Sequence, residues 1–175
     1  MRTLIISDLH ANIDALEALD RETNERGERF DDVVVLGDLV DYGPAPAEVI
    51  AWVRERARHV VRGNHDHAMA TDADCGSSAA FKELSETTRE YFRPLLDDSS
   101  LEYLHSLPAR ARVELDGRTV LLVHATPRSP LYEYLPGDAP ENRWLDSLAR
   151  LVDGADFVFL GHTHLPFVRR IGRVK

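Results

Sequence analysis

Seven side chains of metal-binding type follow short apolar segments of the chain, each near the point where a segment ends. They are Asp8, His10, Asp38, Asn64, His124, His162 and His164. Carboxylate, amide and imidazole groups together form a mixed oxygen and nitrogen ligand set, which suits first-row transition metals better than Mg²⁺ or Ca²⁺. The set contains no thiolate, which argues against a structural zinc site. The spacing of His162 and His164 places both rings on one side of an extended segment, so they could reach adjacent ions.

Each of these motifs has an ordinary structural explanation when it is taken alone. Asp8 could cap a helix, and the Gly37-Asp38 pair could form a turn with an Asx cap. His124 could be a packed core histidine, and the stretch from Gly63 to Asp66 has the composition of a loop. Together they favour a site, because five of the eight histidines lie at these places. Ligands of open α/β sheets bind beyond the carboxyl ends of the strands.

The elements that must position these side chains follow an α/β pattern in the first part of the chain. Apolar runs predict strands over residues 4–6, 33–36 and 59–61. Helical periodicity predicts helices over 12–26 and 47–56, the second opened by Pro46. Continuous apolar strands that alternate with helices indicate a parallel sheet covered by helices.

The rest of the chain has a different pattern. Residues 78–106 are expected to be helical, with a break at Pro94 and a cap at Ser99 or Ser100. Strands at 110–115 and 118–123, joined by Asp116-Gly117, predict a β-hairpin. A helix at 140–151, a buried strand at 157–160 and a final strand over 167–174 complete the prediction.

Composition narrows the class of protein. A chain of 175 residues without repeats is expected to form one domain, residues 1–175. The net charge of −9 argues against an extended nucleic-acid surface. Cys75 is the only cysteine, and no apolar stretch is long enough to span a bilayer, so a cytoplasmic protein with no membrane contact is expected.

The order of the motifs resembles the calcineurin-like metallophosphoesterase superfamily, and its local context resembles the small prokaryotic phosphodiesterase branch. The motifs are Asp-x-His from Asp8, Gly-Asp-x-x-Asp from Gly37, Gly-Asn-His-Asp from Gly63, the single His124 and Gly-His-x-His from Gly161. The resemblance implies a four-layer αββα sandwich with a largely parallel first sheet and a mixed second sheet. Members of the branch usually continue past the last motif, so the C-terminal part is expected to be incomplete, as a fragment or a minimal form.

The resemblance also assigns roles to residues. It implies that Asp8, His10 and His164 hold one metal ion, that Asn64, His124 and His162 hold another, and that Asp38 bridges both. It further implies that His65 is a general acid and that Asp66 orients it.

The chemistry implied is hydrolysis of a phosphodiester or phosphomonoester by a metal-bridging hydroxide, with His65 protonating the leaving group. Manganese is the expected metal, with iron, zinc, nickel and cobalt as alternatives. Arg128, in a loop after His124, and Tyr42 are expected to contact a small phosphate-ester substrate. Alternative functions are a protein Ser/Thr phosphatase, a dinucleoside-polyphosphate hydrolase, or a non-catalytic scaffold of the same fold. An unpaired final strand would favour a homo-oligomer.

Overall fold

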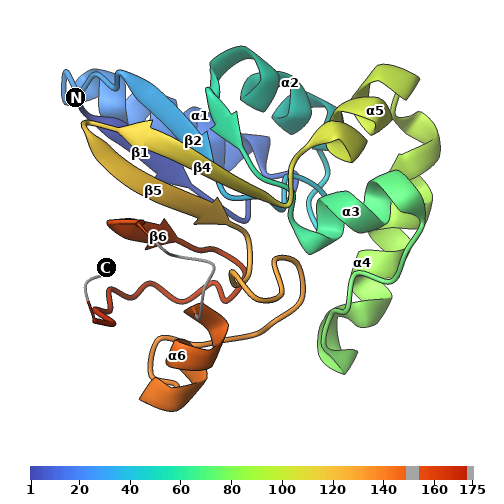
Figure 1. Cartoon of the computed structure of the whole chain (residues 1–175). Helices are drawn as coiled ribbons and strands as arrows, with labels where there is room; N and C mark the ends of the chain where they lie inside the picture. The colour runs from blue at the N-terminus through green and yellow to red at the C-terminus, as the bar shows by residue number, and fades with distance from the viewer. Residues whose placement is uncertain (149–153, 173–175) are drawn as a thin grey trace.

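The computed structural model describes residues 1–148 and 154–172, and it contains two sheets enclosed by helices (Figure 1). In chain order the elements are β1 (Thr3–Ile6), α1 (Ile13–Glu25), β2 (Asp32–Val35), α2 (Pro46–Arg56), β3 (His59–Val60), α3 (Asn64–Thr71), α4 (Ala79–Phe92), the 3₁₀ turn η1 (Arg93–Leu95), α5 (Asp98–Ser106), β4 (Arg110–Leu115), β5 (Arg118–Val123), α6 (Glu141–Leu148) and β6 (Phe157–Phe159).

The first sheet is parallel and has the order β1-β2-β3. Leu4 pairs with Val33, and Val35 pairs with Val60, so the three strands run in the same direction and end at one edge. The connections are helical, as parallel strands require a crossover. This arrangement confirms the α/β pattern predicted for the first part of the chain.

The second sheet is mixed and has the order β4-β5-β6. β4 and β5 form an antiparallel hairpin, and β6 adds to β5 in parallel. The turn residues Asp116 and Gly117 have φ values of 51° and 71°, the sign that a type I′ hairpin turn requires at both positions. The predicted hairpin is therefore confirmed residue by residue.

Three apolar clusters separate four layers and confirm the αββα sandwich. Alternating side chains divide between the faces of β2, with Val35 directed at the helices and Val34 at the other sheet. Phe157 and Phe159 of β6 also lie between the sheets, while Val158 lies on the outer face with Trp144 of α6. In Figure 1 the layers follow one another from α1 and α2, through the two sheets, to α6.

The structure differs from the predictions in three places. Residues 64–66 open helix α3 instead of forming a loop. Helix α5 is capped by Asp97, which accepts a hydrogen bond from the backbone N–H of Ser100 at 2.8 Å, so the predicted cap at Ser99 or Ser100 is wrong. The carboxylate of Asp97 reaches this free N–H group of the first turn from two or three positions before the predicted caps.

The third difference concerns the tail. Residues 167–172 form no strand and only a single bridge at Ile171, so the predicted final strand is wrong there; positions 173 and 174 lie outside the described residues. The side chain of Arg169 donates to the carbonyl oxygens of Gly137 and Ala139 at 2.8 and 2.6 Å, and Phe167 packs against Trp144. These tertiary contacts fix an irregular path. For the predicted helix at 140–151, residues 149–151 likewise lie outside the description.

In the part of the chain that the structure describes, every helix is too short or too polar to cross a lipid bilayer.

Candidate metal centre

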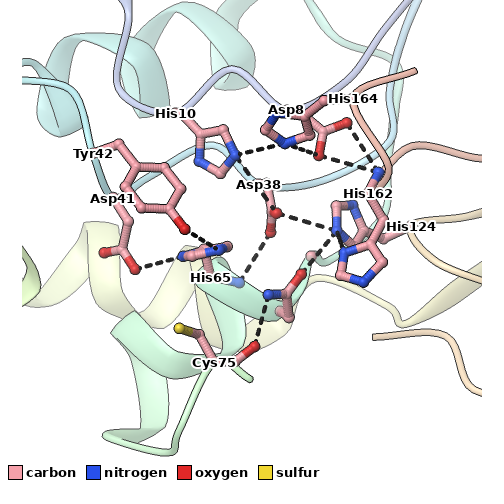
Figure 2. A network of polar contacts seen from close by, with 12 residues as sticks. Asp8, His10, Asp38, Asp41, Tyr42, His65, Cys75, His124, His162 and His164 are labelled. Atoms are coloured by element: carbon pink, nitrogen blue, oxygen red, sulfur yellow. Dashed lines mark hydrogen bonds and ion pairs between the residues drawn. The ribbon is translucent and has the colours of Figure 1, made fainter. Parts of the chain in front are cut away.

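All seven predicted ligands meet at one edge of the two sheets (Figure 2). Asp8 and His10 follow β1, Asp38 follows β2, Asn64 follows β3, His124 follows β5, and His162 and His164 follow β6. Two parallel sheet segments therefore deliver their carboxyl ends to the same place, as ligand sites of α/β proteins require.

The backbone at this edge is strained. Asp8, Asp38 and His164 have φ values of 55°, 54° and 55°, in the left-handed region that non-glycine residues rarely adopt. The chain packs closely around these residues, because a Cβ atom at Gly63 would collide with Asp38, and one at Gly161 would collide with Ser7 and Asp8. Strain of this kind concentrates at functional sites.

The first cluster of ligand atoms belongs to Asp8, His10 and His164. The Nδ1–H of His10 donates to the carbonyl oxygen of Val40 at 3.0 Å, which leaves Nε2 with its lone pair. That Nε2 atom lies 3.2 Å from Nε2 of His164, which in turn lies 3.2 Å from a carboxylate oxygen of Asp8. Three electron-pair donors thus point at the same space.

The second cluster belongs to Asp38, His124 and His162, with Asn64 beside them. The Nδ1–H of His124 donates to Leu36 O at 2.7 Å, so its Nε2 atom faces the site. That Nε2 atom lies 3.1 Å from Asp38 Oδ2, 2.9 Å from Asn64 Oδ1 and 3.2 Å from His162 Nδ1. The amide of Asn64 is oriented because its nitrogen donates to Cys75 O at 2.8 Å.

Both clusters fit a metal ion. Ligand atoms bound to one transition-metal ion at about 2.1 Å lie about 3 Å from one another, which is the spacing seen in each cluster. Asp38 lies between the clusters, because its Oδ2 atom is 3.1 Å from His124 Nε2 and 3.9 Å from His10 Nε2. The oxygen and nitrogen donors suit first-row metals.

Electrostatics at the clusters show the same crowding. Burial would raise the pKa of Asp38, but the histidines around it, first His124, hold that pKa far below its usual range. Burial would lower the pKa of His124, but the adjacent Asp38 carboxylate raises it to about 9. Burial and the charge of His124 lower the pKa of His162 to about 4. The cluster therefore accommodates one proton between Asp38 and His124, where a cation could replace it.

His65 lies beside the clusters on the first turn of α3 and is almost fully buried. Its Nδ1–H donates to Asp41 at 2.7 Å, and its Nε2 atom lies 3.3 Å from the hydroxyl of Tyr42. Burial would lower the pKa of His65, but hydrogen bonding to Asp41 and to the thiol of Cys75, followed by the charge of Asp38, raises it to about 11. His65 therefore carries a proton at neutral pH.

The prediction that Asp66 orients His65 is wrong. Asp66 accepts hydrogen bonds from the backbone N–H groups of Gly63 and Asp38, both at 2.9 Å, and of Leu39 at 2.7 Å. As the third residue of α3, it turns back to cap its own helix and ties the loop after β2 to it. Asp41 is the carboxylate that holds His65.

Arg89 of α4 is a residue that the sequence prediction missed. It is buried, and its guanidinium pairs with the same oxygen of Asp41 at 3.0 Å. Asp41 belonged to a recognised motif, as the second Asp of Gly-Asp-x-x-Asp. Its partner Arg89 lies far along the chain in α4 and belonged to no motif.

The two predicted substrate contacts lie in different surroundings. Tyr42 touches the site, since its ring centroid is 4.6 Å from that of His10 and its hydroxyl is within 3.0 Å of Ser77 Oγ. Arg128 is about half exposed and forms an ion pair with Glu133.

Comparisons with known proteins identify relatives of this fold and site. The family model described as calcineurin-like phosphoesterase superfamily domain matches residues 1–175. An uncharacterized protein of Methanocaldococcus jannaschii is 30% identical over 165 residues, which cover 94% of this chain and 63% of that protein.

Two solved structures are similar. A metallophosphoesterase from Sphaerobacter thermophilus has 37% identity and a TM-score of 0.72 over 95% of this chain and 62% of that one. A hypothetical protein of Pyrococcus horikoshii has 23% identity, a TM-score of 0.74, and coverage of 94% and 70%, and supports the fold alone. The chain thus spans less than two thirds of the length of the Methanocaldococcus jannaschii and Sphaerobacter thermophilus proteins.

Proposed function

The chain belongs to the calcineurin-like phosphoesterase superfamily, and from that membership we propose that it hydrolyses a small phosphodiester with two divalent metal ions. The observation that carries the proposal is the convergence on His124 Nε2 of an oxygen of Asp38, an oxygen of Asn64 and a nitrogen of His162. Electron-pair donors at such short distances repel one another unless protons or a cation lie between them. Because these groups share too few protons, a bound cation accounts for their close approach.

In this proposal the first cluster, Asp8, His10 and His164, holds one ion. Asn64, His124 and His162 hold the other, and Asp38 bridges the two. When bound, the ions supply positive charge for the phosphoryl oxygens and acidify the attacking water. Manganese is our first choice of metal, and iron, zinc, nickel and cobalt are alternatives with the same ligand preferences.

His65 acts as the general acid. Asp41 fixes its Nδ1–H, so that Nε2–H is directed at the hydroxyl of Tyr42, with the hydroxyl of Ser77 also within 3.5 Å. An alkoxide leaving group is a strong base and leaves faster when it receives this proton. Tyr42 then hydrogen-bonds the substrate, and Arg128 contacts it from the loop after His124.

We also propose that residues 1–175 act as one domain, that the reaction takes place in the cytoplasm, and that the chain forms a homo-oligomer. Light scattering at high concentration tests the last point. A mass of 19.7 kDa per particle would contradict it.

Elemental analysis followed by a substrate screen tests the function. Protein dialysed against each divalent metal is expected to retain two ions per chain and to hydrolyse phosphodiesters faster than phosphomonoesters, phosphopeptides or dinucleoside polyphosphates. A chain that binds the ions without hydrolysing any ester would instead be a scaffold. Retention of fewer than two ions would contradict the dinuclear proposal.

A further inference from the structure

Several partly exposed aromatic side chains lie around the candidate metal centre, outside the hydrophobic core. Tyr134, in the loop between β5 and α6, exposes 53% of its surface. Its ring centroid lies 6.0 Å from that of His162, and its hydroxyl donates to Thr163 O at 3.4 Å. A tyrosine that turns its ring to solvent beside a candidate metal ligand can offer that ring to a bound molecule.

A second aromatic pair stands beside the first cluster and His65. The ring of Tyr42 lies 4.6 Å from His10 and 4.9 Å from His65, between centroids (Figure 2). The ring of Phe81, at the start of α4, lies 6.2 Å from Tyr42 and is 57% exposed. Aromatic surface therefore continues from the proton donor to the solvent.

Tyr132 links the two sides. It is 44% exposed and packs across Gly76, where a Cβ atom would lie only 3.3 Å from its ring. The next residue, Ser77, hydrogen-bonds the hydroxyl of Tyr42 at 3.0 Å. The loop that carries Tyr132 and Tyr134 thus contacts the segment that closes the site beside His65.

We define Tyr42, Phe81, Tyr132 and Tyr134 as the aromatic rim. We propose that this rim selects phosphodiesters in which one ester arm is a nucleoside, whose base stacks on Tyr134; the inference rests on the proposed function. A nucleobase is planar, and stacking of a base on an aromatic side chain tolerates any base. The net charge of −9 repels long polyanions, which favours a single nucleotide over a polynucleotide.

Three substrates with the same leaving group separate stacking from chemistry. They are the p-nitrophenyl esters of thymidine monophosphate, methyl phosphate and cyclohexylmethyl phosphate. With the metal-loaded protein, we expect kcat/KM for the thymidine ester to exceed that for the methyl ester by about tenfold, in the range that base stacking supplies. The cyclohexylmethyl ester should stay close to the methyl ester, because it is apolar but not planar.

Variants of Tyr134 assign the preference to its ring. Tyr134→Ala should lower the thymidine-to-methyl ratio about fivefold, whereas Tyr134→Phe, which keeps the ring and loses the hydroxyl, should keep the ratio. Tyr91→Ala is the matched control, since Tyr91 is an exposed tyrosine that packs on Phe92 of α4. Calorimetry with adenosine monophosphate and ribose phosphate gives a second reading, in which only the former should lose affinity in Tyr134→Ala.

The outcomes separate this inference from the function on which it rests. Equal kcat/KM for the thymidine and methyl esters, or an equally good cyclohexylmethyl ester, would overturn the nucleoside preference and leave the phosphodiesterase intact. An unchanged ratio in Tyr134→Ala would overturn the role of that ring. If no ester is hydrolysed, the proposed function fails, and calorimetry decides: tighter binding of adenosine monophosphate supports the rim, and equal binding overturns it.

Discussion

The site has two parts: the proton side, formed by His65 and Asp41, and the cation side, formed by the two clusters of predicted metal ligands. Polar contacts of different kinds hold the two parts together. On the proton side, donors meet an acceptor, because Asp41 accepts from His65 at 2.7 Å and from Arg89 at 3.0 Å. On the cation side, ligand atoms outnumber protons, because Asn64 Oδ1 and His162 Nδ1 also face His124 Nε2, at 2.9 and 3.2 Å, beside the single proton that Asp38 and His124 share. The chain itself pairs the groups of the proton side, whereas the cation side holds one proton among several ligand groups. Removal of metal should therefore disturb the contacts of the cation side and spare those of the proton side.

The largest effect that tests this contrast is expected from Asp38→Asn. Asp38 lies between both clusters, and the substitution removes the negative charge that the two proposed ions would share. Elemental analysis should find less than one ion per chain, and kcat/KM should fall by about 1000-fold or more, because the charge supplied by the metal is lost.

Asp116→Asn is the matched control for that variant, since it makes the same exchange in an exposed hairpin turn. It should retain two ions and full activity. Two ions at full occupancy in Asp38→Asn would show that Asp38 does not bridge the clusters.

A smaller effect is expected on the proton side, from His65→Gln. The variant should keep its metal, and kcat should fall about 100-fold for an alkyl leaving group but only about tenfold for p-nitrophenolate, which leaves with little protonation. His105→Gln on α5 serves as control. Equal losses for both leaving groups would remove His65 from the role of proton donor.

The third prediction concerns the pH dependence of two quantities, the stability of the metal-free protein and its affinity for metal. The pKa of His124 is raised from 6.5 to about 9, so the proton that it holds stabilises the metal-free fold below pH 6.5, and this contribution is lost as pH rises to about 9. Loss of this proton also frees the Nε2 atom of His124 to bind a metal ion. Between pH 6.5 and 9, urea unfolding of chelated protein should show falling stability, while metal affinity rises by up to about tenfold per pH unit.

His124→Gln is the variant that checks this window. It should reduce the slope of stability against pH without abolishing it, because His65, whose pKa is raised to about 11, contributes a loss of the same sign. A metal affinity that does not change between pH 6.5 and 9 would contradict the displacement of a proton from His124.

The smallest effect is expected from Arg128→Ala. Arg128 is about half exposed and already paired with Glu133, so its contact with a substrate is worth little, and KM should rise by only about threefold. Arg118→Ala, at another exposed ion pair, should leave KM as it is. A tenfold or larger rise in KM would show that Arg128 leaves Glu133 for the substrate.

The sequence predicted where the ligands lie better than it predicted what holds them. Continuous apolar runs located the strands, and the carboxyl ends of parallel strands share an edge, so the gathering of Asp8, Asp38 and His162 followed directly. The partner of His65 did not follow. Both Asp41 and Asp66 were near it in the motifs, and the choice depends on α3, which turns Asp66 toward its own N-terminus.

Gly63 and Asp66 did carry a usable signal, because their spacing of three matches a helix cap. The tail offered none. Its alternation of apolar and charged residues predicted a strand, but the contacts of Arg169 with the carbonyl oxygens of Gly137 and Ala139 determine its path, and such contacts are not visible in a pattern.

The left-handed backbone of the ligand residues has a consequence for anyone who engineers this protein. Replacing His10 or His164 by glycine would relieve a conformational cost of about 1 kcal/mol at each position, whereas Asp8 and Asp38 also accept backbone hydrogen bonds that glycine would lose. A library screened only for thermal tolerance would therefore enrich glycine at the two histidines and discard the chemistry. Selection for heat resistance should be run together with a metal-retention assay, with these codons held constant.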